Sequence, residues 1–174
     1  MRARLFVVGA AVLVMGLGSS ASGATARGHA LADDWGGVLG FSHAKVGGGY
    51  WFTCPTLRNT SDRPIEVLEV ELVGAPGHWR TGEARAARRS EMHGITLGAY
   101  DESFVEDPDL MRDYSKEPVR VAPGVESPIY YLVRAEPVTS PVVGKAEGCR
   151  FTYRTGHRIH SQVLHSQLEL EAGD

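Results

Sequence analysis

Hydrophobic and polar positions alternate most clearly in two stretches that lie far apart in the chain. Residues 65–73 place Ile, Val and Leu against glutamates, and the aromatic run 50–54 comes shortly before them. Residues 149–155 alternate Cys, Phe and Tyr with Arg and Thr. A period of two is typical of β-strands with one buried face. Residues 59–62 are typical of a turn before Pro64, and this turn explains the glycosylation sequon that their first three residues also match.

Similar runs elsewhere bring the predicted strands to seven or eight, and such a series favours a sandwich or a barrel. We expect the strands at residues 35–41, 50–57, 65–73, 95–98, 118–121, 129–135, 149–155 and 159–170. The last strand has a phase problem, because Ile159 and Val163 share one parity and the later leucines share the other. A bulge near Leu164 and His165 would reconcile the two, and a helix is the alternative.

The first 26 residues have the three zones of a secretory signal peptide. A basic start is followed by an apolar run over residues 5–18 and by small residues that end at Ala26 in an Ala-x-Ala pattern. The apolar run is shorter than the roughly 20 residues that a membrane-spanning helix needs. We therefore predict a signal peptide over 1–26, a secreted or extracellular protein, and a single domain over 27–174 with a mobile start. An uncleaved N-terminal segment that anchors the protein to the membrane is the alternative.

The two cysteines each lie on the apolar face of a predicted strand. Cys54 shares its face with aromatic residues of the run 50–54, and Cys149 shares its face with Phe151 and Tyr153. In the oxidising compartment that export implies, an even count of two predicts one disulfide. We therefore expect two sheets packed face to face and joined by a Cys54–Cys149 bridge, with two free buried thiols as the alternative.

One long connection loses the alternation and becomes highly charged. Residues 79–92 are rich in arginine and alanine, which favours a short surface helix or an ordered loop. Residues 101–117 are mainly acidic, and Asp107 before Pro108 has the pattern of a helix N-terminus. We expect a charged insert at about residues 80–117, without which the sandwich can close, and predict that it is an ordered flap that carries the recognition surface. Its apolar anchors would be Trp79, Met92, Tyr100, Phe104, Leu110 and Tyr114.

The charge balance bears on the choice of partner. The chain has 18 basic and 21 acidic residues, a formal net charge of −3 at pH 7, and a mature chain without Arg2 and Arg4 would be more negative still. Nucleic acids and anionic membranes attract basic proteins, so we expect neither as a partner. The expected partner is an unknown protein or a cell-envelope component, with membrane contact only if the N-terminal segment stays uncleaved.

Seven histidines raise the hypothesis of an exported protein that binds copper or zinc. His157 and His160 are three residues apart and would point to opposite faces of a strand, and His165 differs in parity from His160. No His-x-Met pair follows His78 or His93, or occurs anywhere else in the chain. We expect no metal site and no cofactor, and keep a metal-binding protein that uses surface histidines as the alternative function.

Catalytic signatures are missing from the sequence. It has neither a Gly-x-Ser-x-Gly elbow nor a His-Glu-x-x-His helix, and the disulfide would leave no free cysteine nucleophile. The acidic run begins like a calcium loop at Asp107 and Asp109, but Met111 is no oxygen ligand and Arg112 replaces the glycine of the sharp turn. We therefore predict that the protein is not an enzyme and has no catalytic residues.

Several motifs together resemble those of small immunoglobulin-like proteins exported by GC-rich Gram-positive bacteria. They are the signal sequence, the Asn-Thr-x-Asp-x-Pro turn from Asn59, the Val-Ala-Pro-Gly turn from Val121 and the Cys-x-Phe-x-Tyr-Arg strand from Cys149. The resemblance covers residues 49–74 and 118–170. Because such proteins are mostly uncharacterised, it implies a fold and no activity. We expect an all-β, immunoglobulin-like antiparallel β-sandwich of seven or eight strands with one inter-sheet disulfide, acting as an exported, non-catalytic surface or interaction module.

Overall fold

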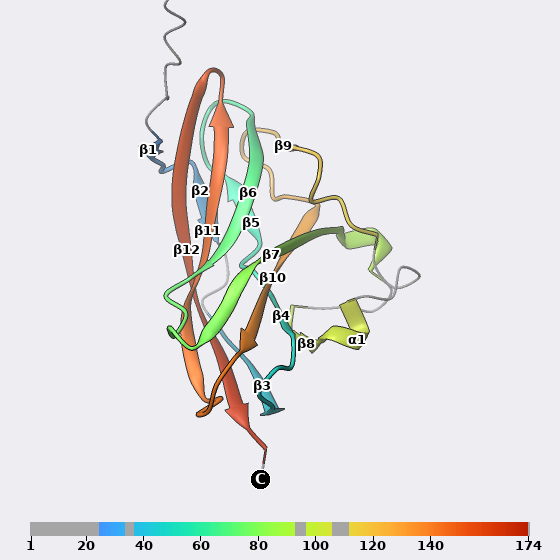
Figure 1. The fold of residues 1–174 in the computed structure, drawn as a ribbon. Helices are drawn as coiled ribbons and strands as arrows, with labels where there is room; N and C mark the ends of the chain where they lie inside the picture. The colour runs from blue at the N-terminus through green and yellow to red at the C-terminus, as the bar shows by residue number, and fades with distance from the viewer. Residues whose placement is uncertain (1–24, 34–36, 93–96, 106–111, 174) are drawn as a thin grey trace, which may run out of the picture.

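The computed structural model describes residues 25–33, 37–92, 97–105 and 112–173, and most of them lie in strands (Figure 1). The strands are β1 (Ala26–Arg27), β2 (Leu31–Asp33), β3 (Val38–Ala44), β4 (Tyr50–Thr53), β5 (Leu57–Asn59), β6 (Ile65–Val73), β7 (Trp79–Arg88), β8 (Ala99–Asp101), β9 (Val119–Val121), β10 (Ile129–Pro137), β11 (Gly144–Thr155) and β12 (Arg158–Ala172). Two short helical segments accompany them, the 3-10 helix η1 (Arg89–Glu91) and the α-helix α1 (Glu102–Val105).

The larger sheet has the strand order β1-β12-β11-β6-β9, and β3 pairs with a further part of β12. Strands β12, β11, β6 and β9 pair antiparallel, whereas β1 and β3 run parallel to β12. Alternation decides which side chains face the core: Phe151 and Tyr153 of β11 are buried, and Arg150 and Arg154 are exposed. The strands that the sequence predicts at β6 and β11 are therefore confirmed.

The second sheet has the order β7-β10-β4-β8, and β2 pairs with β5 in a two-stranded ribbon. Six strands have the order and sheet assignment of strands B to G of an immunoglobulin domain. The equivalents of D, E and B, which are β7, β10 and β4, lie in this second sheet. The equivalents of C, F and G, which are β6, β11 and β12, lie in the larger sheet. The place beside β4, which strand A holds in constant-type domains, is taken by β8. The all-β, immunoglobulin-like sandwich is thus confirmed.

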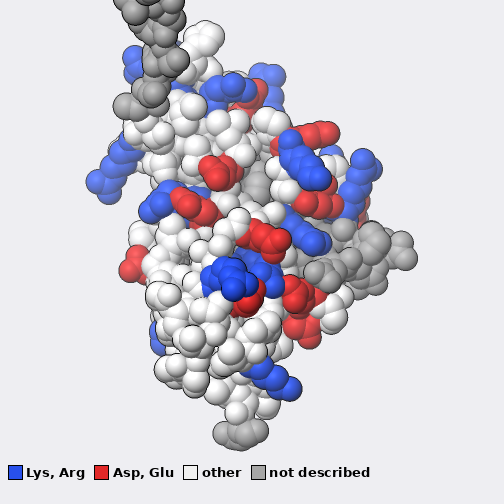
Figure 2. Space-filling view, viewed as in Figure 1, with Lys and Arg blue, Asp and Glu red and all other residues white. Residues whose placement is uncertain are grey.

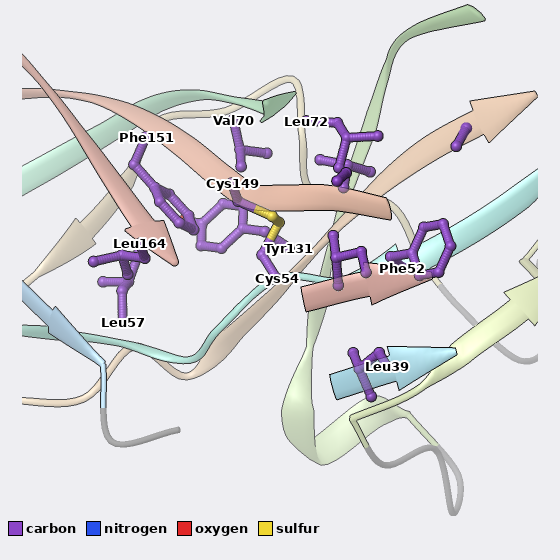
Figure 3. Packing of buried hydrophobic residues seen from close by; sticks show 14 of the residues in the cluster. Leu39, Phe52, Cys54, Leu57, Val70, Leu72, Tyr131, Cys149, Phe151 and Leu164 are labelled. Carbon is purple, nitrogen blue, oxygen red and sulfur yellow. A yellow bond between two sulfur atoms is a disulfide. The ribbon is translucent and has the colours of Figure 1, made fainter. Parts of the chain in front are cut away.

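A disulfide joins Cys54, which directly follows β4, to Cys149 in β11. The Cα atoms of the two cysteines lie 5.8 Å apart. Figure 3 shows the disulfide among buried side chains, with Tyr131 and Phe151 beside it. These two rings meet edge to face with their centroids 5.4 Å apart. The bridge therefore links the two sheets through the main core, as predicted, and it indicates an oxidising compartment.

Strand β7 departs most from the sequence-based expectation. The helix or loop predicted for residues 79–92 is wrong, because Trp79–Arg88 is a ten-residue strand that pairs along β10. Ala84 and Ala86 face the main core, while Arg85 between them lies over a ring on the outer face. Tertiary packing thus overrides the helix propensity of alanine and arginine. Residues 80–117 are therefore not a separate addition to the sandwich, since this range contains β8 and most of β7.

The strand count and some boundaries also differ from the prediction. The described residues form twelve strands instead of seven or eight. The predicted strand 50–57 is divided into β4 and β5, which belong to different sheets, and Pro55, which has no N–H to donate, separates them. Residues 27–34 were expected to be mobile, but the described part, residues 27–33, contributes to β1 and β2, and Leu31 is buried in the core.

Two further predictions fall partly or wholly outside the described residues. The strand expected at 95–98 lies partly outside them, and the strand found next along the chain is β8. The helix expected after Asp107 lies almost entirely outside them. The first strand, expected at 35–41, is observed as β3 at Val38–Ala44.

Strand β12 is continuous over fifteen residues, so the helical alternative is wrong. Its pairing with β11 shifts register between Ala146 and Gly148, close to the bulge predicted at Leu164 and His165. The shift does not exchange the two faces, because the buried leucines of β12 keep one parity throughout. The phase problem has a simpler cause: Ile159 is an exposed residue on the outer face.

The turn after β5 is organised by Asn59. Its Nδ2 donates to the carbonyl oxygens of Arg63 at 2.8 Å and Val121 at 3.1 Å, and its Oδ1 accepts from the N–H of Ser61 at 3.0 Å. The side chain is fully buried. The predicted turn is confirmed, and the folded protein does not present Asn59 for glycosylation.

Candidate interaction surface

The connection from β7 to β10, residues 89–128, is called the insert below. Among its described parts, β8 pairs with β4 at the edge of the four-stranded sheet, and β9 pairs with β6 of the larger sheet (Figure 1). Alternate residues of β4, β7 and β10 point away from the main core and form a second apolar cluster. The cluster consists of Trp51, Ala87, Tyr130 and Leu132 from the strands, with Met92, Leu97 and Tyr100 from the insert. Because residues of the insert cover strand residues that would otherwise face water, burial of apolar surface docks the insert on the sheet.

A charged network extends this docking contact. Arg134, on β10, donates to Glu102 Oε1 from Nη2 at 2.5 Å and from Nε at 3.0 Å, and to Glu136 from Nη1 at 2.9 Å, while Glu83 lies 3.4 Å away. Burial lowers the pKa of Arg134, but the two bonded carboxylates outweigh it and raise the pKa above its usual value. A Cβ on Gly49 would lie 2.5 Å from Glu102 Oε1, so glycine makes room for the pair. The network joins α1 to the sheet.

The returning part of the insert caps the free edge of β7. The N–H of Ala86 donates to Asp113 Oδ1 at 3.1 Å, and the N–H of Tyr114 donates to the carbonyl of Ala86 at 2.6 Å. The Asp113 carboxylate also accepts from the N–H and hydroxyl of Ser115. Burial raises the pKa of Asp113, but the bonds from Ala86 and Ser115 outweigh it and hold the pKa below its usual value. The cap blocks an edge that could otherwise pair with another chain.

Four arginines and three aromatic rings form what we call the arginine–aromatic cluster. The pairs, with the distance from the guanidinium carbon to the ring centroid, are Arg85 over Trp51 (5.0 Å), Arg89 over Tyr130 (4.9 Å), and Arg88 and Arg112 over Tyr114 (5.2 and 5.1 Å). Hydrogen bonds orient two rings: Tyr114 donates to Glu91 at 2.6 Å, and Tyr130 accepts from Arg89 Nε at 2.7 Å. The bond to Tyr130 raises the pKa of Arg89. Stacked arginines and tyrosines are typical of protein interfaces.

Two hollows flank Tyr114. One of about 190 Å³ lies between β6 and β7, and one of about 240 Å³ lies between the insert and the start of β10. Both are lined by Tyr114, Glu117 and Val119. Pockets for drug-sized ligands usually measure about 300–1,000 Å³. Each hollow is therefore sized for a side chain of a partner.

The outer face of the larger sheet is electrostatically balanced. Arg150 bonds to Glu71 at 2.7 Å, Lys145 bonds to Glu169 at 2.6 Å, and Arg154 bonds to Glu66. The pair with Lys145 lowers the pKa of Glu169. Figure 2 shows basic and acidic side chains interspersed on the displayed face of the molecule, with a largely uncharged lower end. Exposed pairs of this kind stabilise a fold by only about 0–1 kcal/mol each.

The predicted anchors of the insert have different roles in the structure. Met92 and Tyr100 dock the insert on the second apolar cluster, and Tyr114 packs against the main core. Trp79 begins β7 and belongs to the main core, so it is not an anchor of the insert. Leu110 lies outside the described residues, as does the side chain of Phe104.

The histidines considered as metal ligands do not converge in the described part of the chain. The ring of His160 stacks on Tyr153 with a centroid distance of 5.5 Å, whereas His165 is exposed further along β12. No group of three or more His, Cys, Asp or Glu side chains among the described residues is placed to hold a metal ion. His93 lies outside the described residues.

Sequence reasoning did not single out Arg134, Glu102 or Asp113. The position of Arg134 on the outward parity of β10 indicates only that its side chain faces away from the core. Asp113, two residues before Ser115, has the pattern of a side chain that bonds to the backbone in a turn, and that was the available signal. The local sequence does not indicate which strand the carboxylate of Glu102 or of Asp113 contacts.

No protein-family model matches this chain, and no curated protein matches it. None of the helices in the described ranges is long and apolar enough to cross a membrane.

Proposed function

We propose that this chain is an exported, non-catalytic β-sandwich domain that acts as an interaction module, with the arginine–aromatic cluster as its recognition surface. The observation that carries the proposal is the fixation of the insert on two sides, by Arg134 with Glu102 and by Asp113 with Ala86. A surface held in place before binding loses little conformational entropy when a partner arrives. Loops on a rigid scaffold commonly carry binding function in this way.

Export is supported by two independent features. The signal-peptide pattern over residues 1–26 directs the chain out of the cytoplasm. The Cys54–Cys149 disulfide is of the kind that persists in oxidising compartments. The partner is accordingly a protein or another component of the cell envelope, and the negative net charge argues against nucleic acid.

The side chains of the arginine–aromatic cluster indicate which chemical groups the partner should carry. Arg88 has 46% of its side-chain surface exposed, and its ion pair with Glu91, at 3.3 Å, is made through Nε. Arg112 is exposed and contacts Tyr114 through its ring face. Guanidinium groups bind carboxylates and other oxyanions through two parallel hydrogen bonds. The recognition surface therefore suits an acidic segment of a partner.

The test is crosslinking of the tagged protein in its native compartment, followed by identification of the linked partner by mass spectrometry. We expect the double variant Arg88→Glu/Arg112→Glu to recover about tenfold less of a partner than the wild type, in the range of a strong interface contact. The matched control is Arg63→Glu/Arg158→Glu, which makes the same charge change on exposed arginines outside the cluster. Equal recovery with both double variants, or no partner with the wild type, would contradict the proposal.

Metal analysis of the same native protein addresses the alternative. The described histidines provide no convergent geometry for copper or zinc. We expect substoichiometric metal in protein purified without chelators. Stoichiometric copper or zinc would contradict the interaction module and support the alternative function, an exported metal-binding protein.

A further inference from the structure

Part of strand β6 forms an edge that is neither paired with another strand nor capped among the described residues. Strand β9 pairs with β6 only at Ile65, Glu66 and Val67. Beyond this point, at residues 68–73, β6 has no strand partner on that side among the described residues. The transition is marked by a register shift against β11, in which Leu68 is the additional residue between Val67 and Glu69.

The edge of β7 that lies opposite this part of β6 is protected against pairing with an added strand. Its pairing with β10 is irregular around Gly82, where φ is +120°, and Asp113 and Tyr114 occupy the N–H and carbonyl of Ala86. Bulges and caps of this kind prevent unwanted strand pairing. Of these two facing edges, the edge of β6 is therefore the one at which an added strand can pair.

The hollow of about 190 Å³ opens along this edge. Four consecutive β6 residues, 67–70, line it, which means that the strand backbone itself borders the space. Val70 on β6, Ala84 and Ala86 on β7, and Val119 on β9 supply apolar walls. A strand added to β6 would point alternate side chains into this hollow and the others toward solvent.

The charges beside the edge indicate what the solvent-facing side chains should be. Within the described residues, the carboxylates of Glu69 and Glu117, which both line the hollow, have no hydrogen-bond or ion-pair partner, whereas the neighbouring Glu71 is paired with Arg150. Arg85 also lines the hollow, but its guanidinium lies over the Trp51 ring. Oppositely charged residues on adjacent strands stabilise the pairing, and like charges oppose it. A second copy that paired through its own β6 would bring Glu69 and Glu71 against the same glutamates, which argues against self-association here.

We propose that the β6 edge binds an extended peptide segment in which apolar residues alternate with basic ones, by strand addition. The proposal rests on the proposed function, because the returning insert at Tyr114, Glu117 and Val119 forms one wall of the site. It adds a second recognition element to the arginine–aromatic cluster. The backbone hydrogen bonds of the added strand give affinity, and the hollow together with Glu69 gives sequence preference.

The experiment measures binding of a capped synthetic peptide of alternating lysine and valine, matched in length to β6, to the mature, disulfide-bonded protein. We expect saturable binding by fluorescence anisotropy and slower amide exchange at residues 69–73 in the bound protein. A peptide with glutamate in place of lysine should not bind. A lysine–valine peptide with a central proline should not bind either, although its charge is the same, because proline lacks the N–H that pairs with the edge.

Variants of the protein separate strand addition from simple charge attraction. Glu69→Lys should weaken binding by about threefold or more, in the range of a cross-strand charge pair. Glu171→Lys, the same change at an exposed site on β12, should leave affinity unchanged. Ala84→Leu, which fills the hollow, should abolish binding while circular dichroism shows a cooperative melt.

Three results would overturn the inference: no binding of the lysine–valine peptide, equal binding of the proline-containing peptide, or unchanged exchange at residues 69–73. These results are distinguishable from failure of the proposed function. If partner recovery still depends on Arg88 and Arg112 while the peptide does not bind, the recognition surface stands and only strand addition is rejected. If the peptide binds and no partner is recovered, the β6 site stands without the arginine–aromatic cluster.

Discussion

At the scale of single residues, close approach of backbone and side chain decides several positions. Gly148 has a φ of +141°, and a Cβ there would lie 2.3 Å from the carbonyl oxygen of Leu164 on the neighbouring strand. Gly49 likewise leaves room for the ion pair of Glu102 and Arg134. Asn59 uses its buried amide to close a turn. In each case one side chain, or the lack of one, permits a contact between distant segments.

Gly148→Ala should destabilise the protein by about 2 kcal/mol or more, because the new Cβ meets backbone and the φ is unfavourable for L-residues. Urea unfolding followed by tryptophan fluorescence measures the change. Gly77→Ala is the matched control, since a Cβ at Gly77 would meet no atom within 4 Å. Equal midpoints for the two variants would show that β11 and β12 adjust without cost.

Asp113→Ala should expose the N–H of Ala86 to faster amide exchange, because the carboxylate that accepts it is removed. The pKa of Asp113 is lowered in the folded protein, so its contribution is present above the pKa of the unfolded chain, near 4, and is lost as the pH falls through the folded value. Exchange at Ala86, corrected for its intrinsic pH dependence, should therefore quicken only in acid.

Asp113→Asn is the control for this prediction, since the amide oxygen still accepts the bond but does not titrate over that range. It should retain protection at Ala86 and remove the acid-dependent change. The same exchange rate in the wild type and in the alanine variant would contradict the capping role of Asp113.

At the scale of elements, β7 and the insert are integral parts of the sandwich, although their charged composition favours a helix or a loop outside it. Strand β7 holds the place of strand D, and β8, from within the insert, occupies the position beside β4. The outer face of the sheet carries a second apolar cluster that the insert covers with Met92, Leu97 and Tyr100. The insert thus stabilises the sheet as well as presenting the arginine–aromatic cluster.

Replacement of residues 82–115 by a Gly-Ser linker should prevent cooperative folding. The change removes most of β7 and all of β8, and it exposes Trp51, Tyr130 and Leu132 to water. Thermal unfolding followed by far-ultraviolet circular dichroism provides the measurement. The same linker inserted after Gly77, in the turn before β7, should leave a cooperative transition. A cooperative melt of the replacement variant would mean that the sandwich closes without these strands.

At the scale of the whole molecule, the predicted signal-peptide boundary lies at the first strand of the described domain. Ala26 and Arg27 form β1 and pair in parallel with His160 and Ser161, and the N–H of Gly28 donates to Ser161 at 2.8 Å. A cleavage site after Ala26 would therefore lie inside a paired strand once the domain is folded. The described chain begins and ends at opposite ends of the larger sheet (Figure 1).

The mature protein should begin near Arg27, because the signal pattern places cleavage after Ala26. Removal of residues 1–26 keeps the Gly28 bond to Ser161 and leaves the main core complete. N-terminal sequencing of protein from its native compartment tests this prediction. Material that begins at Met1 and sediments with membranes would favour the anchored alternative.

The sequence by itself determined the all-β class, the strands at β6 and β11, the turn at Asn59 and the disulfide between Cys54 and Cys149. These features depend on local alternation, on turn chemistry and on a count of two cysteines, all of which are visible along the chain. Only the tertiary structure decided that residues 79–88 form a strand, because alanine and arginine suit a helix as well as a close-packed strand until β10 lies beside them. Likewise, the contacts of Arg134 with Glu102 and of Asp113 with Ala86 join segments far apart in sequence, and no local periodicity specifies which distant strand a polar side chain will contact.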